Sequence, residues 1–310
     1  MINEGLIIKG VGGLYTVKTT DSEIECRARG VFRRNKMVPT VGDRVFVENN
    51  TITKIYPRKN SLIRPSVSNI DKLFIVVSFA DPEPDVYYID KLIAIAVYHD
   101  IEPILVFNKI DLGDKNKVYE IYKKLPYKNY LVCASSDNND NDKENLDCLR
   151  GEILNCISAL AGFSGVGKSS ILNLLAEFNS AEVGEISKRL QRGKNTTRHV
   201  ELFSFCGGII ADTPGFSSLS FEYFNIKDRS KLQYCFVEFE KYLMKCRFSD
   251  CIHYKESDCA VHKAVNDGFI SQSRYDSYTK MFEEIGIYKE WENKVKEKYK
   301  DEDRENEDSE

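Results

Sequence analysis

The segment from Gly162 to Ser169, GFSGVGKS, restricts the fold of this chain more than any other segment. It satisfies the pattern G-x-x-x-x-G-K-[ST], in which the backbone N–H groups of a glycine-rich loop hold phosphate groups. The apolar segment 156–161 precedes it and the helical segment 169–176 follows it. Because such a loop binds phosphate between a buried strand and a helix N-terminus, the sequence predicts an α/β sheet here. A simple glycine-rich turn is the alternative that this context disfavours.

The residue types in this loop suit a nucleoside triphosphate bound with Mg²⁺. The ammonium group of Lys168 would reach the β- and γ-phosphates, and the hydroxyl of Ser169 would ligate the metal. Lys168 is therefore also a predicted catalytic residue. The predicted phosphate-binding residues are Gly162, Phe163, Ser164, Gly165, Val166, Gly167, Lys168, Ser169 and Ser170.

A second motif, Asn108-Lys109-Ile110-Asp111, selects the base. It directly follows the apolar segment 104–107, at the carboxyl end of a predicted strand, where α/β sheets bind ligands. The Asp111 carboxylate can accept bonds from the ring N1–H and the amino group of guanine. Adenine lacks both donors and would leave this carboxylate unsatisfied, at a cost of ~1–3 kcal/mol. We expect Lys109 to lie along the base and Asn108 to join this loop to the phosphate loop.

Two further segments complete the expected nucleotide site. Asp212, which ends an apolar segment, suits the carboxylate that holds Mg²⁺ through water, and the N–H of Gly215 suits the γ-phosphate. Either Thr196 or Thr197, in the polar segment 192–199, is expected to complete the Mg²⁺ ligands, with Thr197 slightly favoured.

The order of these motifs differs from that of an ordinary small GTPase, in which the phosphate loop comes first and the base motif last. Here residues 108–111 precede 162–169, which precede 212–215. Because a permutation only moves the chain termini, the same sheet can still close. The sequence thus predicts a central α/β P-loop GTPase domain, residues 67–218, with circularly permuted motifs. Its other expected elements are strands at 73–79, 130–134 and 201–205, a helix at 86–99 and a loop at 137–145.

The expected catalytic site lacks an obvious residue to position water. Ras-type enzymes often carry Gln directly after the second switch glycine, where this chain has Phe216, which cannot orient water. We therefore expect slow hydrolysis in the absence of a partner. His199 is the candidate for the missing role, and a solvated or structural histidine is the alternative.

A cluster of cysteine and histidine residues near the C-terminus predicts a metal site. Three thiolates and one imidazole make a full tetrahedral set, typical of a closed structural zinc site. Scattered thiols or a redox pair are the alternatives, and Cys235 or His262 could substitute for one ligand. The predicted zinc ligands are Cys246, Cys251, His253 and Cys259. The remaining cysteines show no framework spacing and are expected to be plain thiols: Cys26, Cys133, Cys148, Cys156 and Cys206.

Residues 1–66 form short β-rich segments separated by turns at Gly12-Gly13 and Asn49-Asn50. This pattern favours a small N-terminal β-barrel that resembles an OB-fold, although an SH3-like barrel fits nearly as well. The segment contains twelve Lys and Arg residues against six Asp and Glu residues. Such an excess favours a surface that binds polyanions, with a merely solvated surface as the alternative.

The C-terminal part of the chain has few strand signals. Residues 219–300 are predicted to form a mainly helical zinc-binding domain, with helices at 228–245 and 260–300. The tail 301–310 carries seven acidic residues and one basic residue and is expected to be disordered. No apolar run approaches the ~20 residues of a membrane span, and the N-terminus lacks the pattern of a signal peptide. We therefore expect a cytoplasmic protein without membrane contact.

In combination these motifs resemble one family, the circularly permuted GTPases that depend on the small ribosomal subunit (the ribosome biogenesis GTPase A family). The resemblance covers about residues 1–290 and also includes PTVGDRV (39–45), NTTRH (195–199) and SQSRYDSY (271–278). It implies hydrolysis of GTP to GDP and phosphate, stimulated by the small subunit, and a role in late maturation of that subunit. It also implies rRNA contacts by the OB-fold and the zinc domain. The chain departs from the family at Asn195, where a histidine is usual, and we expect it to be a monomer.

Two other classes of function compete with this interpretation. A P-loop kinase or ATPase is opposed by the base motif at 108–111 and by the lack of a domain for an acceptor substrate. A nucleic-acid-binding module whose nucleotide site only signals occupancy is compatible with Phe216.

Overall fold

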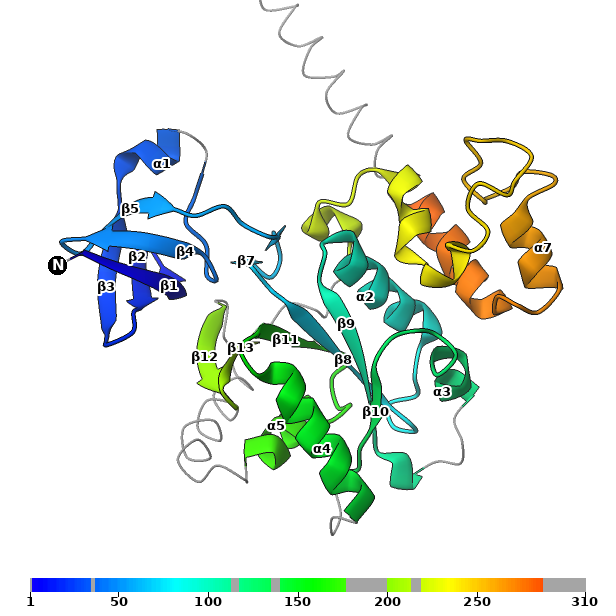
Figure 1. Ribbon diagram of the computed structural model, residues 1–310, viewed down its shortest axis with the longest axis horizontal. Helices are drawn as coiled ribbons and strands as arrows, with labels where there is room; N and C mark the ends of the chain where they lie inside the picture. The colour runs from blue at the N-terminus through cyan, green and yellow to red at the C-terminus, as the bar shows by residue number, and fades with distance from the viewer. Residues whose placement is uncertain are drawn as a thin grey trace, which may run out of the picture. The chain divides into compact units, whose positions relative to one another are not determined.

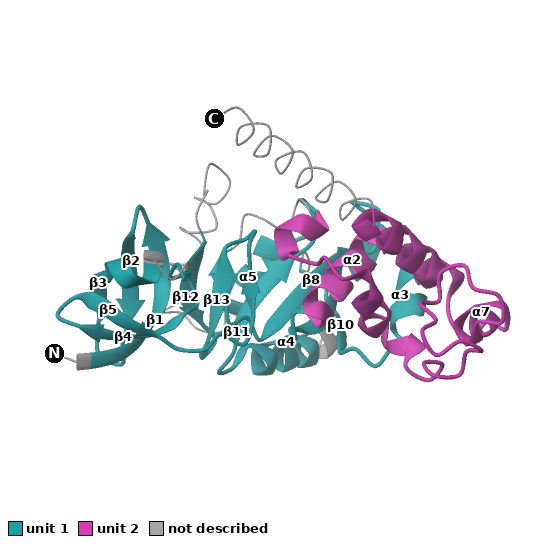
Figure 2. Cartoon of the chain, turned by 90° about the horizontal axis from the view of Figure 1, so that it is seen from above, with its two compact units in different colours: residues 1–85, 99–219 teal, residues 86–98, 220–310 magenta. Residues whose placement is uncertain are grey.

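The computed structural model of the chain describes residues 2–34, 37–112, 117–134, 140–176, 200–212 and 219–286. The chain forms two compact units, which Figure 2 distinguishes by colour. The first comprises residues 1–85 and 99–219, and the second comprises residues 86–98 and 220–310. None of the helices in the described ranges has the length and apolar character that crossing a bilayer requires.

The N-terminal part of the first unit is a closed five-stranded barrel (Figure 1). Its strands follow the order β1-β2-β3-β5-β4, and β4 pairs back to β1, with Leu6 opposite Arg44. Its elements are β1 (Ile2–Val11), β2 (Leu14–Lys18), β3 (Glu23–Ala28), α1 (Gly30–Arg34), β4 (Arg44–Glu48) and β5 (Thr51–Ile55). The closure and strand order confirm the predicted OB-like barrel.

Two tight turns and a buried aspartate shape this barrel. The turns at Gly12-Gly13 and Asn49-Asn50 connect paired strands, and both asparagines have positive φ (46° and 58°), as a two-residue hairpin turn requires. Asp43 is fully buried, and both of its carboxylate oxygens accept bonds from Arg58 at 2.7 Å. A short hairpin, β6 (Ser61–Leu62) and β7 (Val67–Ser68), follows the barrel, and Ser68 Oγ donates to Asp43 at 2.6 Å. The segment after the barrel is thus attached to it through a buried carboxylate.

The central sheet continues from the barrel, because β1 pairs with its edge strand β12 at Lys9 and Glu201. The strand order is β10-β9-β8-β11-β13-β12, in which all strands except β12 run parallel. Its strands are β8 (Lys72–Ser78), β9 (Glu102–Asn108), β10 (Asn129–Leu131), β11 (Ile157–Ala161), β12 (Glu201–Phe205) and β13 (Gly208–Asp212). The other elements of this part are η1 (Ile110–Leu112), α3 (Lys117–Tyr122), α4 (Asp140–Ile153) and α5 (Lys168–Ala176).

Strands β8 and β9 are buried along almost their whole length, which explains their continuous apolar sequence. Helices α4 and α5 lie along one face of this sheet (Figure 1). Side chains of both helices, including Leu149 and Leu172, form one core with Val76, Val106 and Ile210 of the strands. This packing holds the carboxyl ends of the parallel strands at one edge, where the predicted motifs follow them.

One sequence-based expectation about this region is wrong. The segment 137–145 was expected to be a loop, but α4 begins at Asp140. Its apolar stripe starts only at Leu146 and continues at Leu149 and Ile153, all of which are buried. The first turn of the helix therefore has a polar, loop-like sequence. The helix is anchored one turn later by Asn145, whose side chain donates to the Leu131 carbonyl at 2.9 Å.

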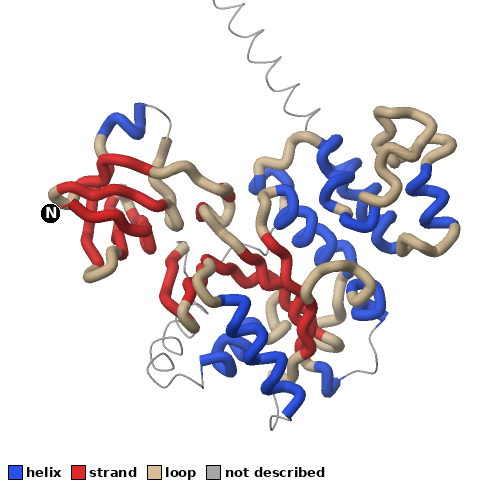
Figure 3. The backbone as a smooth tube through the Cα atoms, in the orientation of Figure 1, coloured by secondary structure: helices blue, strands red, loops and turns tan. Residues whose placement is uncertain are grey.

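In its described part the second unit contains only helices and loops, whereas strands dominate the first unit (Figure 3). Residues 228–245, predicted to be helical, contain two short 3₁₀ helices, which Phe236 separates because it is extended (φ −110°, ψ 91°). The elements of this unit are α2 (Val86–Tyr98), η2 (Phe221–Phe224), η3 (Arg229–Cys235), η4 (Val237–Phe239), α7 (Ala260–Asn266) and a helix over 272–286. The boundaries 67–218 and 219–300 remain predictions.

A buried ionic cluster holds α2 in the second unit. Arg274, whose side chain is 1% exposed, donates to Asp90 of α2 at 2.6 Å and to both carboxylate oxygens of Glu238 at 2.7 and 3.0 Å. Next to it, Lys91 donates to Glu284 at 2.6 Å. Burial lowers the pKa of Lys91 below its ordinary value, against the effect of Glu284. Helix α2 is therefore attached to residues 220–286 by paired charges that are costly to separate.

We predict that Arg274→Met destabilises the second unit strongly, because it leaves two buried carboxylates without their cation. The expected loss is about 3–5 kcal/mol in the free energy of unfolding. Arg247→Met is the matched control, since Arg247 pairs with Asp258 at 3.1 Å while both side chains are more than half exposed. It should cost at most about 1 kcal/mol. Urea unfolding followed by circular dichroism compares the two variants, and equal losses would contradict the prediction.

Candidate nucleotide and metal sites

The predicted phosphate loop connects β11 to α5. Gly162 has a φ of 143°, and a Cβ there would lie 2.4 Å from the Val76 carbonyl oxygen. Gly167 has a φ of 97°, and a Cβ there would lie 2.1 Å from Asn108 Nδ2. Only glycine therefore fits at either position. Val166 between them is buried in the core beneath the loop, which fixes the loop against the sheet.

Lys168 bends back over this loop at the N-terminus of α5. Its Nζ donates to the carbonyl oxygens of Gly162 and Phe163, each at 2.8 Å. Burial lowers the pKa of Lys168 below its ordinary value. A cation held in this way, next to the N–H groups at a helix N-terminus, can bind an anion such as phosphate.

Asn108, which is 1% exposed, connects three segments at the carboxyl edge of the sheet. Its Nδ2 donates to the Val166 carbonyl of the phosphate loop at 2.9 Å. Its Oδ1 accepts the backbone N–H of Ala134 at 3.1 Å. The two predicted nucleotide motifs, which lie about fifty residues apart in the chain, are thus joined by one side chain.

Lys109 contacts a segment that the sequence interpretation did not include. Its Nζ donates to the Asp81 carbonyl oxygen in the loop after β8, and Ser78 Oγ donates to the same oxygen at 3.0 Å. Pro82, the next residue in that loop, approaches Gly165 of the phosphate loop. A backbone acceptor leaves no signal in an amino-acid sequence, so Asp81 could not have been predicted.

Asp111 lies in the 3₁₀ turn η1, with its side chain exposed beside the loop. Its Oδ1 is 3.0 Å from the Sγ of Cys133, which follows β10. The sequence grouped Cys133 with the scattered thiols, because its spacing from Asp111 carries no recognisable pattern. The fold brings the two together at neighbouring strand ends.

Asp212 ends β13, beside the strand β11 that leads into the phosphate loop. Burial, and then the charge of Glu201, raise the pKa of Asp212 above its ordinary value. A carboxylate in this setting is stabilised by a nearby cation, and together with the Ser169 hydroxyl it offers the hard oxygen donors that Mg²⁺ prefers. The other predicted residues of this part lie outside the described residues: Thr196, Thr197, His199, Gly215 and Phe216.

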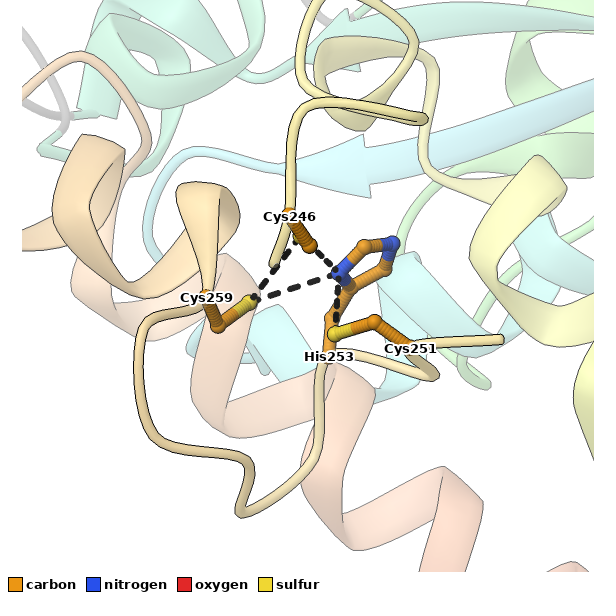
Figure 4. A group of neighbouring side chains, drawn as sticks. All are labelled: Cys246, Cys251, His253 and Cys259. Carbon is orange, nitrogen blue, oxygen red and sulfur yellow. Dashed lines mark hydrogen bonds between the residues drawn. The ribbon is translucent and has the colours of Figure 1, made fainter. Parts of the chain in front are cut away.

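The four predicted zinc ligands lie together in the second unit (Figure 4). Nδ1 of His253 is 3.4, 3.4 and 3.3 Å from the sulfurs of Cys246, Cys251 and Cys259, and two of these sulfurs are 3.9 Å apart. Tetrahedral zinc would separate two sulfurs by about 3.8 Å and a sulfur from a nitrogen by about 3.6 Å. These donors therefore suit a tetrahedral metal ion.

Neighbouring side chains hold the loop that carries these four residues in place. Three backbone N–H groups, of Ile252, Tyr254 and Lys255, donate to the Glu256 carboxylate at 2.8–3.1 Å. The Tyr275 hydroxyl lies 3.1 and 2.9 Å from the carbonyl oxygens of residues 253 and 254, within hydrogen-bond distance of both.

The two substitute ligands that the sequence left open lie outside the cluster. His262 contacts the Tyr275 hydroxyl at 2.5 Å, and Cys235 lies against the Lys231 carbonyl at 3.8 Å. Among the described residues, the donors that meet are the four that the sequence favoured.

The fold and the site together define a P-loop GTPase with circularly permuted motifs. Comparisons with known proteins agree with this class. Two family models, the RsgA N-terminal domain and the RsgA GTPase, match residues 4–56 and 55–222. A third, the 50S ribosome-binding GTPase, matches residues 157–290.

Relatives extend the match over most of the chain. The small ribosomal subunit biogenesis GTPase RsgA of Clostridium kluyveri is 40% identical over 93% of this chain and 99% of the relative. The protein of the same name from Clostridium botulinum (strain 657 / Type Ba4) is 39% identical over 91% of this chain and 97% of the relative. YjeQ from Thermotoga maritima superposes with a TM-score of 0.75 at 32% identity, over 92% of this chain and 99% of YjeQ. YloQ, a circularly permuted GTPase, superposes with a TM-score of 0.73 at 34% identity, over 93% of this chain and 96% of YloQ. The chain therefore belongs to the RsgA GTPase family.

Proposed function

We propose that this GTPase binds GTP at the edge where β8, β9 and β11 end, and that it acts in maturation of the small ribosomal subunit. The observation that carries the proposal is the Asn108 side chain, which joins the base motif to the phosphate loop. One ligand that spans both motifs must carry a base at one end and phosphates at the other. The names of the relatives, small ribosomal subunit biogenesis GTPases, support the biological role.

The roles within the site follow from the donors that each residue offers. The two Asp111 oxygens accept the N1–H and amino group of guanine, and Lys109 lies along the base. The N–H groups of residues 162–170 and the Lys168 ammonium bind the phosphates. Ser169 and Asp212 would hold Mg²⁺, which when bound neutralises charge on the phosphates. Thr196 or Thr197 and the Gly215 N–H are proposed to complete the site, with His199 as a candidate for positioning water.

The metal that we propose for the second unit is zinc. Three thiolates and an imidazole are soft or borderline ligands, which exclude Mg²⁺ and Ca²⁺ on chemical grounds. Four protein donors leave no open position for a substrate or water, so the ion would stabilise the loop without a catalytic role.

A basic and aromatic surface of the second unit supports contact with rRNA. We define the zinc-loop surface by Lys245, Arg247 and Lys255, which lie over the rings of Tyr242, Phe248 and Tyr254 at 6.0, 5.6 and 4.6 Å. The three cations are exposed and the rings are exposed or half-buried. Cations bind phosphates and ring faces stack on unpaired bases, so this surface fits structured RNA with accessible bases. We propose the cytoplasm as the compartment, since the proposed partner is a ribosomal subunit.

We predict that Asp111→Asn changes the base that the protein prefers from guanine to xanthine. An amide can donate to the C2 carbonyl of xanthine, whereas it loses one acceptor for guanine. Affinity for GTP should fall by at least about tenfold, and affinity for xanthosine triphosphate should rise. Nucleotide titrations of both proteins measure this exchange. Unchanged affinity for GTP in the variant would exclude Asp111 as the reader of the base.

We predict about one zinc ion per chain in the purified protein. Cys251→Ala should lose that ion and should unfold the second unit at a lower temperature, because metal binding contributes directly to folding. Cys235→Ala is the control, since it removes a buried thiol outside the cluster and should retain the metal. Elemental analysis gives the metal content. A full complement of zinc in Cys251→Ala would contradict the ligand assignment.

We predict that purified small ribosomal subunits accelerate GTP hydrolysis, whereas large subunits do not. Stimulation should fall as salt is added, because RNA binding releases condensed counterions. Reversing two charges, Lys245→Glu with Arg247→Glu, should lower the slope of log affinity against log salt by about two. Lys124→Glu, an exposed lysine of the first unit, is the control. Equal hydrolysis rates with small subunits, large subunits and neither would refute the role.

A further inference from the structure

Three charged side chains form a row across neighbouring strands at the nucleotide edge of the central sheet. In the hairpin of β12 and β13, Glu201 lies directly opposite Asp212. On the other side of β12, Lys9 of the barrel strand β1 lies directly opposite Glu201. The Nζ of Lys9 is 3.6 Å from Glu201 Oε2. Because directly opposite residues of antiparallel strands project to the same face, all three side chains lie on one face of the sheet.

This face is the one that the helix after the phosphate loop covers. Side chains alternate along a strand, so Asp212 shares its face with Ile210, and Glu201 shares its face with Phe205. Both Ile210 and Phe205 belong to the core that the strands form with α4 and α5. Helix α5 begins directly after the phosphate loop. The two carboxylates of the row are therefore on the side of the sheet where α5 and the phosphate loop lie.

The two carboxylates lie on adjacent strands, which are separated by ~4.8 Å. Burial is the larger cause that raises the pKa of Asp212, and the charge of Glu201 is the second cause. Two negative charges this close repel each other, and a divalent cation beside them relieves the repulsion. The side chains of Glu201 and Lys9 are 34% and 47% exposed, so water and salt screen their charges only in part.

We propose that Glu201 strengthens Mg²⁺ binding at the nucleotide site from beside Asp212, and that Lys9 of the barrel weakens this effect. The inference rests on the proposed function, in which Asp212 and Ser169 hold the metal. Glu201 is not a ligand in this arrangement. It adds negative charge one strand away from Asp212, and the ammonium of Lys9 offsets part of that charge. The barrel is thereby linked to the nucleotide site through one cross-strand ion pair.

This role predicts opposite effects with and without the metal. Loss of the Glu201 charge should weaken Mg²⁺ binding to the complex with GDP. In the absence of Mg²⁺ the same loss should raise the affinity for GDP, because one negative charge near the phosphates has been removed. A purely structural role of Glu201, in pairing β12 with β1, would lower GDP affinity under both conditions.

Titration of Mg²⁺ into the GDP complex of the full-length protein provides the test, with the dissociation rate of a fluorescent GDP as the readout. Glu201→Gln should raise the Kd for Mg²⁺ by about threefold to fivefold at low salt, and less at high salt. Glu201→Asp keeps the charge and should remain close to the unsubstituted protein. Glu102→Gln is the control and should leave the Kd unchanged. Glu102 also pairs with a lysine, at 3.1 Å, but it begins β9 at the amino edge of the sheet.

Lys9→Gln should act in the opposite direction and lower the Kd for Mg²⁺ by about twofold. Its control is Lys59→Gln, which should have no effect. Lys59 pairs with Asp71 at 3.3 Å and is 49% exposed, but Asp71 precedes β8 at the amino edge. If Glu201→Gln does not fold, an unchanged Kd in Lys9→Gln overturns the inference.

An equal Kd for Mg²⁺ in the unsubstituted protein and Glu201→Gln would overturn the inference, as would an equal loss of GDP affinity with and without Mg²⁺. The two hypotheses fail separately. If Mg²⁺ does not change GDP dissociation from the unsubstituted protein, the proposed nucleotide site is wrong. If it changes dissociation equally in both proteins, only the role of Glu201 is wrong.

Discussion

The structure of the proposed nucleotide site depends on one buried amide, the side chain of Asn108. Its Nδ2 donates to Val166, and the phosphate loop approaches so closely that Gly167 has no room for a Cβ. Its Oδ1 accepts from Ala134, which fixes the segment after β10. A buried amide with both ends bonded is stable, whereas one left without a partner is costly. The base loop, the phosphate loop and the segment after β10 therefore hold their relative positions through this side chain.

Permutation of the motifs is possible because this contact depends on the sheet and not on the order of the chain. Strands β8, β9, β11 and β13 run parallel, so their carboxyl ends lie along one edge whatever their sequence order. A permutation places the chain termini in a different connection between the strands of the same sheet. In this chain the cut places the barrel before β8 and lets the segment after Asp212 continue into the second unit.

The sequence predicted the parts of the fold that depend on local pattern. Strands β8 and β9 are continuous apolar runs, and the phosphate loop and the metal ligands have diagnostic spacings. It could not predict α4, because the first turn of this helix is polar and its apolar stripe begins late. Nor could it predict the Asp81 carbonyl that binds Lys109, or the Cys133 thiol that binds Asp111. Both are contacts between segments distant in sequence, which only the assembled sheet brings together.

Helix α2 belongs to the second unit, where Arg274 binds Asp90 in a buried pair, yet β8 precedes it and β9 follows it in the chain. Asp81, whose carbonyl accepts from Lys109 of the base motif, lies five residues before Val86 at the start of α2. Five extended residues span at most about 17 Å. The buried pair keeps α2 with residues 220–286, so only a short length of chain separates the backbone acceptor of the base motif from a helix of the second unit.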